Sequence, residues 1–350
     1  MTEDHTAVEG SRAPVIVVTG PTASGKSGLA LAIAEAFDGT VINADSMQVY
    51  RELEILTARP DAEALARAPH RLYGVIPGAE SCSAGRWRAL ALKEIDAVLE
   101  KDRLPIVVGG TGLYLKALAE GLAALPSIPA EVRERARARH ALLGGAAFHA
   151  ELALRDPATA ARLHAADSQR LIRAWEVLEA TGRSLTDWQA ETEAAPASYR
   201  FASFVLLPPR PALYAACDRR FEAMLAAGAL DEVRALLALD LDPALPVMKA
   251  LGVAELADHL RGTLSLEAAV DKAQQATRRY AKRQVTWLRT QGPPGAPGAG
   301  REAEAGLAAV AASRQASTNP APCVLESQYS ESFNPKIFNK IREFELTLPG

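Results

Sequence analysis

Gly20-Pro21-Thr22-Ala23-Ser24-Gly25-Lys26-Ser27 decides the fold of this chain, because it matches G-x-x-x-x-G-K-[ST] at every constrained position. The apolar run at 15–19 before it predicts a buried strand, and residues 28–34 after it predict a helix. Backbone N–H groups and the helix dipole favour an anion in such a loop. We expect Lys26 to reach a terminal phosphate and Ser27 to hold Mg²⁺. The loop therefore predicts a site for a di- or triphosphate.

The composition is that of a globular enzyme, with 49% hydrophobic and 23% charged residues and a net charge of −3. This charge excludes nucleic-acid binding by bulk charge, so such a site must be a local basic patch. The wide spacing of Cys82, Cys217 and Cys323 argues against a disulfide framework and a zinc site. No apolar run reaches the ~18 residues of a membrane span, and the polar start lacks a signal-peptide core. We expect a cytoplasmic protein without membrane association.

Strand and helix patterns alternate through the first third of the chain, with further apolar strands at 40–43 and 104–108. This alternation predicts an α/β fold, with a P-loop NTPase-like parallel sheet covered by helices on both faces. Residues 126–198 have helical spacing and no strand pattern, which predicts an all-helical insertion domain. Strand pattern returns at 201–207. The expected segments are a disordered N-terminus (1–13), the first part of the core (14–125), the insertion (126–198), the second part of the core (199–290) and a flexible tail (291–350).

The reaction class depends on where the acids lie. The strand at 104–108 runs into Gly109-Gly110-Thr111 and ends without the acid that a hydrolytic nucleotidase needs to help hold Mg²⁺. The acid follows the second strand instead, at Asp45. Because the carboxyl ends of adjacent parallel strands face one crevice, we expect Asp45 and Thr111 near the phosphate loop. Asp45 is suited to act as a general base or to help hold Mg²⁺; a cap on a turn is the structural alternative.

A basic helix is expected at 274–289, a stretch without acidic residues. Ala273, Tyr280 and Trp287 recur every seven residues and predict its buried stripe. The basic side chains then lie on exposed faces suited to RNA phosphates; a merely solvated helix is the alternative. These side chains are Arg278, Arg279, Lys282, Arg283 and Arg289. A second cluster of four arginines lies at 133–139, within the expected insertion.

Seven ordered segments together resemble the tRNA dimethylallyltransferases, also called tRNA isopentenyltransferases. They are the phosphate loop, NADSMQVY at 43–50, TARP at 57–60, PHRL at 69–72, VGGTGLY at 108–114, DSQRLIRA at 167–174 and KRQVTWLR at 282–289. The resemblance covers about residues 15–289, which is most of the chain. It implies transfer of a dimethylallyl group from dimethylallyl diphosphate to the N6 amine of the adenine 3′-adjacent to the tRNA anticodon, with release of diphosphate.

The resemblance also implies a role for individual residues. The phosphate loop holds the diphosphate rather than ATP, with Mg²⁺ at Ser27 and a further contact from Arg220. Asp45 takes the proton of the amine, and Thr111 orients the reacting groups. The helical insertion binds the anticodon stem-loop, and we expect a monomer. The implied tRNA contacts are Asp45, Ser46, Met47, Gln48, Thr111, Arg133, Gln169, Arg170, Leu171, Ile172, Arg173, Lys249, Lys282, Arg283, Gln284 and Arg289.

Two other functions stay open from the residues alone. A small-molecule or nucleoside kinase, with ATP in the phosphate loop and Asp45 as base, explains the loop but neither basic cluster. A non-catalytic RNA-binding module explains the basic clusters, but it does not explain why Lys26, Ser27 and Asp45 are all intact.

Overall fold

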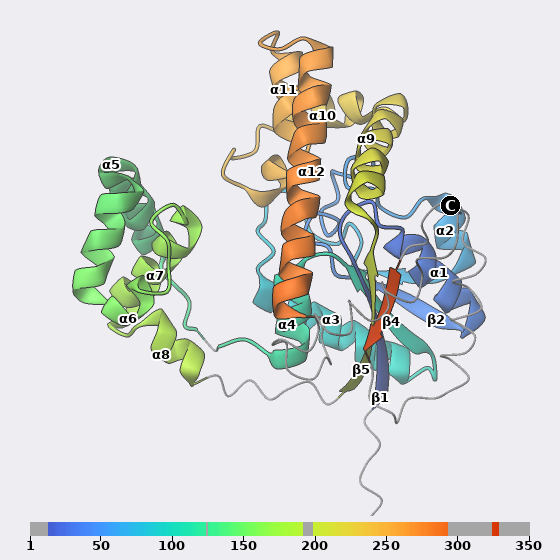
Figure 1. Cartoon of the computed structure of the whole chain (residues 1–350), viewed down its shortest axis with the longest axis horizontal. Helices are drawn as coiled ribbons and strands as arrows, with labels where there is room; N and C mark the ends of the chain where they lie inside the picture. The colour runs from blue at the N-terminus through green and yellow to red at the C-terminus, as the bar shows by residue number, and fades with distance from the viewer. Residues whose placement is uncertain (1–12, 124, 192–198, 293–323, 329–350) are drawn as a thin grey trace, which may run out of the picture. The chain divides into compact units, whose positions relative to one another are not determined.

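The computed structural model describes residues 13–123, 125–191, 199–292 and 324–328. The chain forms two compact units (Figure 1): residues 120–196 form one, and the segments before and after them form the other. We call them the helical unit and the α/β unit. The sequence placed the insertion at 126–198. The predicted N-terminal segment lies almost entirely outside the described residues.

The α/β unit is built on a sheet with the strand order β3-β2-β4-β1-β5-β6. The first five strands in the chain pair in parallel, which confirms the predicted P-loop NTPase-like α/β class. They are β1 (Ala13–Thr19), β2 (Gly39–Asn43), β3 (His70–Arg71), β4 (Leu104–Gly109) and β5 (Tyr199–Leu207). The last strand, β6 (Val324–Gln328), pairs antiparallel with β5 and falls within the predicted tail at 291–350.

Alternation along the strands divides the core into two layers. Ile16 and Val18 of β1 pack with Leu29 and other residues of α1 (Lys26–Ala36). Val15 and Val17 face the opposite layer. That layer contains α3 (Ala84–Leu99), α4 (Gly112–Glu120) and the helices that follow β5. The short α2 (Ala62–Arg67) precedes β3. Helices therefore cover both faces of the sheet, which leaves the carboxyl ends of the strands for the site.

The helices after β5 end in the long α12 (Leu266–Gln291), which Figure 1 shows beside α9. Its buried side chains recur every three to four residues, and all but Leu288 are small or polar: Ala269, Ala273, Thr277, Ala281, Gln284 and Leu288. The prediction that Tyr280 and Trp287 form the buried stripe is wrong, because both are only half-buried at its edge. The preceding elements are α9 (Arg210–Ala226), α10 (Ala229–Leu237), the 3₁₀ turn η1 (Pro246–Lys249) and α11 (Val253–Leu260).

The helical unit has its own apolar core, formed by side chains such as Phe148, Leu152 and Trp175. Its longest helix, α5 (Ala130–Arg155), is kinked at Gly144, whose φ of 73° is left-handed. The other helices are α6 (Pro157–Ala160), α7 (Ser168–Thr181) and α8 (Leu185–Ala190). Among the described residues, no helix of either unit is both long and apolar enough to cross a membrane.

Candidate active site

The phosphate loop joins β1 to α1 through two left-handed residues. Ala23 has a φ of 61°, and Gly25, at the N-cap of α1, has a φ of 86°. No side chain caps α1. Because the first N–H groups of a helix have no partner within it, the start of α1 at Lys26 is free to bind an anion. Ser27, the predicted Mg²⁺ contact, is exposed at this end.

Two cations lie beside the loop. Lys26 donates a hydrogen bond from Nζ to the Pro21 carbonyl at 3.2 Å. Arg220, from α9, donates to the Thr22 hydroxyl. Burial lowers the pKa of Lys26 to about 8; the charge of Asp45 opposes this shift, and the charge of Arg220 adds to it. Burial also lowers the pKa of Arg220. Two half-buried cations near one carboxylate form a site that favours a polyanion.

The turn after β2 holds Asp45 at the predicted place. Its N–H donates to Asn43 Oδ1 at 2.8 Å, and Asn43 Nδ2 donates to the carbonyls of Asp45 (3.0 Å) and Leu72 (3.1 Å). Asp45 Oδ1 accepts from the Met47 N–H at 2.9 Å, so this oxygen caps a turn. No hydrogen bond within the described chain uses Asp45 Oδ2. One carboxylate can therefore serve both as a turn cap and as a base. Asn43, which sequence reasoning missed, fixes its backbone.

Thr111 connects the ends of β2 and β4. Its Oγ1 accepts from the Ser46 N–H at 3.0 Å and lies 3.3 Å from Ser46 Oγ. The strands approach so closely here that a Cβ on Gly109 would lie 2.2 Å from the Ala44 backbone. The hydroxyl of Tyr280 in α12 lies close to Thr111. The structure thus brings the two predicted catalytic side chains to one edge of the sheet.

Gln284 has a different position from the one that we predicted. It is buried, its Oε1 accepts from the Thr22 N–H at 2.8 Å, and its Nε2 donates to the Gly110 carbonyl at 2.9 Å. Both ends of its amide are used inside the α/β unit, so the predicted tRNA contact is wrong for this side chain. The recurrence of buried positions every three to four residues along α12 is the signal that could have found it.

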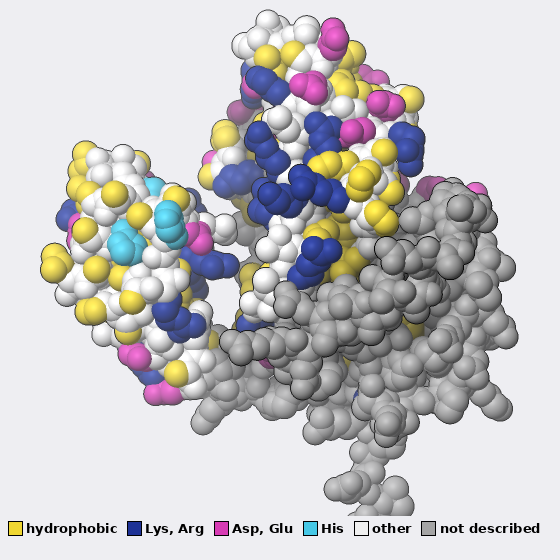
Figure 2. All heavy atoms as spheres, viewed as in Figure 1, with side chains coloured by type: hydrophobic (Ala, Val, Ile, Leu, Met, Phe, Trp, Pro, Cys, Tyr) yellow, Lys and Arg dark blue, Asp and Glu magenta, His cyan; other side chains and the backbone are white. Residues whose placement is uncertain are grey.

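The remaining predicted tRNA contacts of the α/β unit differ in exposure. Gln48 uses its Nε2 to donate to the carbonyls of Thr57 and Ala58, at 2.9 and 2.8 Å. Met47 is half-buried against the core. The basic residues Lys249, Lys282, Arg283 and Arg289 are exposed. Figure 2 shows lysine and arginine side chains gathered along α12.

The segment that follows Gln48 is held by a residue that sequence reasoning missed. The carboxylate of Glu232 in α10 accepts the N–H groups of Glu54, Ile55 and Leu56 at 2.6 to 2.9 Å. Three bonds to one carboxylate fix the turn that carries the two carbonyls bound by Gln48. No motif in the sequence links these positions.

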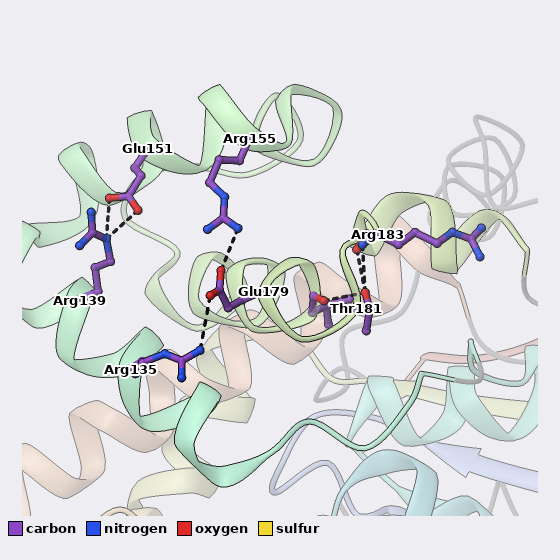
Figure 3. A network of polar contacts seen from close by, with 8 residues as sticks. Arg135, Arg139, Glu151, Arg155, Glu179, Thr181 and Arg183 are labelled. Carbon is purple, nitrogen blue, oxygen red and sulfur yellow. Dashed lines mark hydrogen bonds and ion pairs between the residues drawn. The ribbon is translucent and has the colours of Figure 1, made fainter.

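In the helical unit, some arginines of the basic cluster at 133–139 form ion pairs and others do not. Arg135 and Arg155 both bind Glu179, and Arg139 binds Glu151 (Figure 3). The exposed Arg133 and Arg137 form no ion pair with any described residue. These two share a helix face, because they are four residues apart.

On α7, the predicted contacts lie on different sides of the helix. Gln169 is exposed, and Arg170 is exposed beside Asp167 at 3.4 Å. Arg173 pairs with Glu176 at 3.3 Å, and Ile172 is half-buried. Leu171 is fully buried in the core, so its predicted tRNA contact is wrong; an apolar side chain at this position stabilises the unit itself.

Comparisons with known proteins agree with this geometry. The family model described as IPP transferase matches residues 48–291, and the model described as Isopentenyl transferase matches residues 13–79. A tRNA dimethylallyltransferase of Rhodospirillum centenum is 61% identical over 279 residues, covering 79% of this chain and 89% of that protein. The tRNA dimethylallyltransferase of Paramagnetospirillum magneticum is 52% identical over 336 residues, covering 96% and 98%.

Solved structures give the same result. The tRNA isopentenylpyrophosphate transferase of Bacillus halodurans is 33% identical, with a TM-score of 0.57 over 80% of this chain and 87% of that chain. A eukaryotic dimethylallyltransferase acting on tRNA shares the fold at 24% identity, with a TM-score of 0.68 over 97% and 87%. Because the larger family model spans most of the chain and close relatives cover most of its length, this chain belongs to the tRNA dimethylallyltransferase family of enzymes.

Proposed function

We propose that this enzyme transfers a dimethylallyl group from dimethylallyl diphosphate to the N6 amine of the adenine 3′-adjacent to the anticodon of tRNA, with release of diphosphate. One observation carries the proposal. The carboxylate of Asp45, with an unused Oδ2, lies at the same edge of the sheet as a phosphate loop flanked by two half-buried cations, Lys26 and Arg220. The pairing of a base with an anion site fits attack by an amine and departure of a diphosphate.

The phosphate loop binds the diphosphate of the donor. The uncapped start of α1, the ammonium of Lys26 and the guanidinium of Arg220 supply positive charge there. As the bond between the dimethylallyl carbon and the diphosphate oxygen breaks, negative charge grows on the leaving group. Charges already in place stabilise this change without reorganising. The kinase alternative is not favoured, because the relatives at 52–61% identity are named tRNA dimethylallyltransferases.

Asp45 acts as the base. As N6 of the adenine bonds to the dimethylallyl carbon, the nitrogen loses a proton, and Asp45 Oδ2 accepts it. Asn43 and Met47 hold the aspartate through its backbone and its other oxygen, so the free oxygen has a fixed direction. Thr111 holds the Ser46 N–H, and thereby positions the turn that carries the base. The adenine must leave its stack to reach this site.

Mg²⁺ fits this site only together with the diphosphate. Within the described residues, no group of three or more His, Cys, Asp or Glu side chains could hold a metal ion. Mg²⁺ is commonly held by few protein oxygens, with substrate phosphates and waters completing its shell. Ser27 would hold it here, and the ion would neutralise charge on the diphosphate.

The tRNA anticodon stem-loop binds through exposed basic side chains on both units. On α12 these are Arg279, Lys282, Arg283 and Arg289; on the helical unit they are Arg133 and Arg137, with Gln169 and Arg170. Phosphate contacts of this kind position RNA without reading its sequence. The enzyme acts as a cytoplasmic monomer.

A donor assay tests this function. Purified protein is incubated with Mg²⁺ and unmodified tRNA, with labelled dimethylallyl diphosphate in one arm and γ-labelled ATP in the other. We expect label in tRNA from the first donor only. Phosphate transfer from ATP would support a kinase, and tRNA binding without transfer would support a non-catalytic RNA-binding protein.

A further inference from the structure

One side of α12 rests on the loops of the active site. Tyr280, Gln284 and Trp287 follow one another at helical spacing, so they share a side of the helix. The Tyr280 hydroxyl lies close to Thr111. The Trp287 ring lies so close to Gly112 that a Cβ there would be 2.4 Å from ring atoms. The helix that carries the basic side chains is therefore packed on the β4–α4 loop.

Gln284 makes the central contact of this side. It joins two catalytic loops that no other described side chain bridges: it accepts from the Thr22 N–H and donates to the Gly110 carbonyl. The fit is tight, since a Cβ on Gly110 would lie 2.3 Å from Gln284 Nε2 and 2.8 Å from the Gly20 carbonyl. Removing the amide would leave two backbone groups in a buried place without these partners.

The neighbours of Gln284 in the sequence point the other way. Lys282 and Arg283 are exposed, as is Arg279 one turn earlier. The side of α12 suited to RNA phosphates and the side that holds the phosphate loop thus belong to the same two helical turns. Because the helix is rigid over these two turns, restraining its exposed side also restrains the side that contacts the phosphate loop.

We propose that Gln284 couples the two substrate sites: RNA bound to the exposed basic side of α12 holds the helix in place, and Gln284 then holds the phosphate loop in the geometry that binds diphosphate. This inference rests on the proposed function. Gln284 is a positioning residue in it, because both ends of its amide are bound within the protein.

The sign of the coupling separates this mechanism from simple electrostatics. RNA and diphosphate are both anions, so direct repulsion would make each weaken the binding of the other. Coupling through α12 makes each strengthen the other, and linkage requires the same factor in both directions. Tighter binding in the presence of tRNA is thus the specific expectation.

Calorimetry with inorganic pyrophosphate and Mg²⁺ measures the coupling, since pyrophosphate cannot transfer a prenyl group. We expect saturating unmodified tRNA to lower the Kd of pyrophosphate at least about fivefold in the wild type. Gln284→Met keeps the volume of the side chain but loses both hydrogen bonds. It should bring the ratio of the Kd without tRNA to the Kd with tRNA close to one. The matched control is Thr277→Val, because this buried α12 hydroxyl bonds only to Ala273 of its own helix; it should keep the wild-type ratio.

A wild-type ratio at or below one overturns the proposal, and so does a Gln284→Met protein that melts normally and keeps the full ratio. Hydrogen exchange on the wild type is a second test that needs no variant. There tRNA must slow exchange of the Thr22 amide, and unchanged exchange overturns the coupling. A labelled-donor control separates the two claims. Transfer to tRNA with a ratio of one rejects only the coupling, whereas tightening without transfer rejects the proposed function.

Discussion

Helices α5 and α12 both span 26 residues and both carry a run of basic side chains, yet the two helices use them differently. In α5, Arg135 and Arg139 pair with glutamates of the same unit. In α12, only Arg278 forms such a pair within the described chain, with Asp218 of α9. A basic run in a sequence therefore overstates the charge available to RNA in α5 more than in α12.

The inward sides of the two helices differ as well. α5 buries Phe148 and Leu152, which contribute only to the core of the helical unit. α12 buries small residues, one leucine (Leu288) and Gln284, and it contacts the phosphate loop through Gln284. A large apolar side chain fills space, whereas an amide fixes the positions of the groups that it binds. We therefore expect α5 to serve RNA binding alone, and α12 to serve both RNA binding and the geometry of the phosphate loop.

The largest effect should come from a change that touches neither helix. Asp45→Asn keeps the shape of the side chain but removes the proton acceptor, so single-turnover transfer should fall about 10²–10⁴-fold. Binding of tRNA and diphosphate should stay near wild type, because the amide keeps the size of the side chain and its oxygen can still accept from the Met47 N–H. A fall in transfer of less than about fivefold would mean that Asp45 only caps its turn.

The next effect concerns the loop that α12 holds. Lys26 has a pKa of about 8 in the free protein, so its ammonium is present below that pH and is lost above it. The Kd of pyrophosphate should rise as the pH increases through 8, and binding near pH 8 should take up protons. Lys26→Ala should lower transfer ~100-fold and remove this pH dependence. A dependence that persists in Lys26→Ala belongs to another group.

Of the two helices, α12 should have the larger effect on tRNA binding, through its exposed basic side. Arg279→Ala combined with Arg283→Ala removes two exposed cations four residues apart, and each lost phosphate contact lowers the slope of log K against log salt by ~0.9 for duplex nucleic acid and ~0.7 for single strands. Titrations of tRNA at several salt concentrations measure this slope. Pyrophosphate binding without tRNA should not change. An unaltered slope in a normally melting variant would show a merely solvated helix.

In α5 the matched pairs of arginines should separate. Arg133→Ala with Arg137→Ala should flatten the salt dependence of tRNA binding and leave the melting temperature near wild type. Arg135→Ala with Arg139→Ala should leave the salt dependence near wild type and lower the melting temperature, since these arginines bind Glu179 and Glu151. Exposed ion pairs contribute little, so this is the smallest of the expected effects. Equal salt slopes for the two variants would mean that ion pairing does not decide which arginines bind RNA.

Much of the fold and part of the site could be predicted from the sequence, because local patterns carry them. The phosphate loop lies between its expected strand and helix. Thr111 contacts Ser46, the residue after Asp45, because parallel strands end at one edge. β3 is too short to show alternation. Gln284 and Leu171 were assigned to RNA because a motif names positions but not the side of the helix on which they lie. The bond from Glu232 to a turn 176 to 178 residues away leaves no local signal at all.

Mapping the product tests the central claim most directly. Wild-type enzyme is incubated with labelled dimethylallyl diphosphate and two tRNAs that differ only in the base 3′-adjacent to the anticodon, adenine in one and guanine in the other. Nuclease digestion and mass spectrometry then locate the label. We expect a dimethylallyl group on N6 of that adenine and no label in the guanine tRNA. Label at other positions, or equal label in both tRNAs, would contradict it.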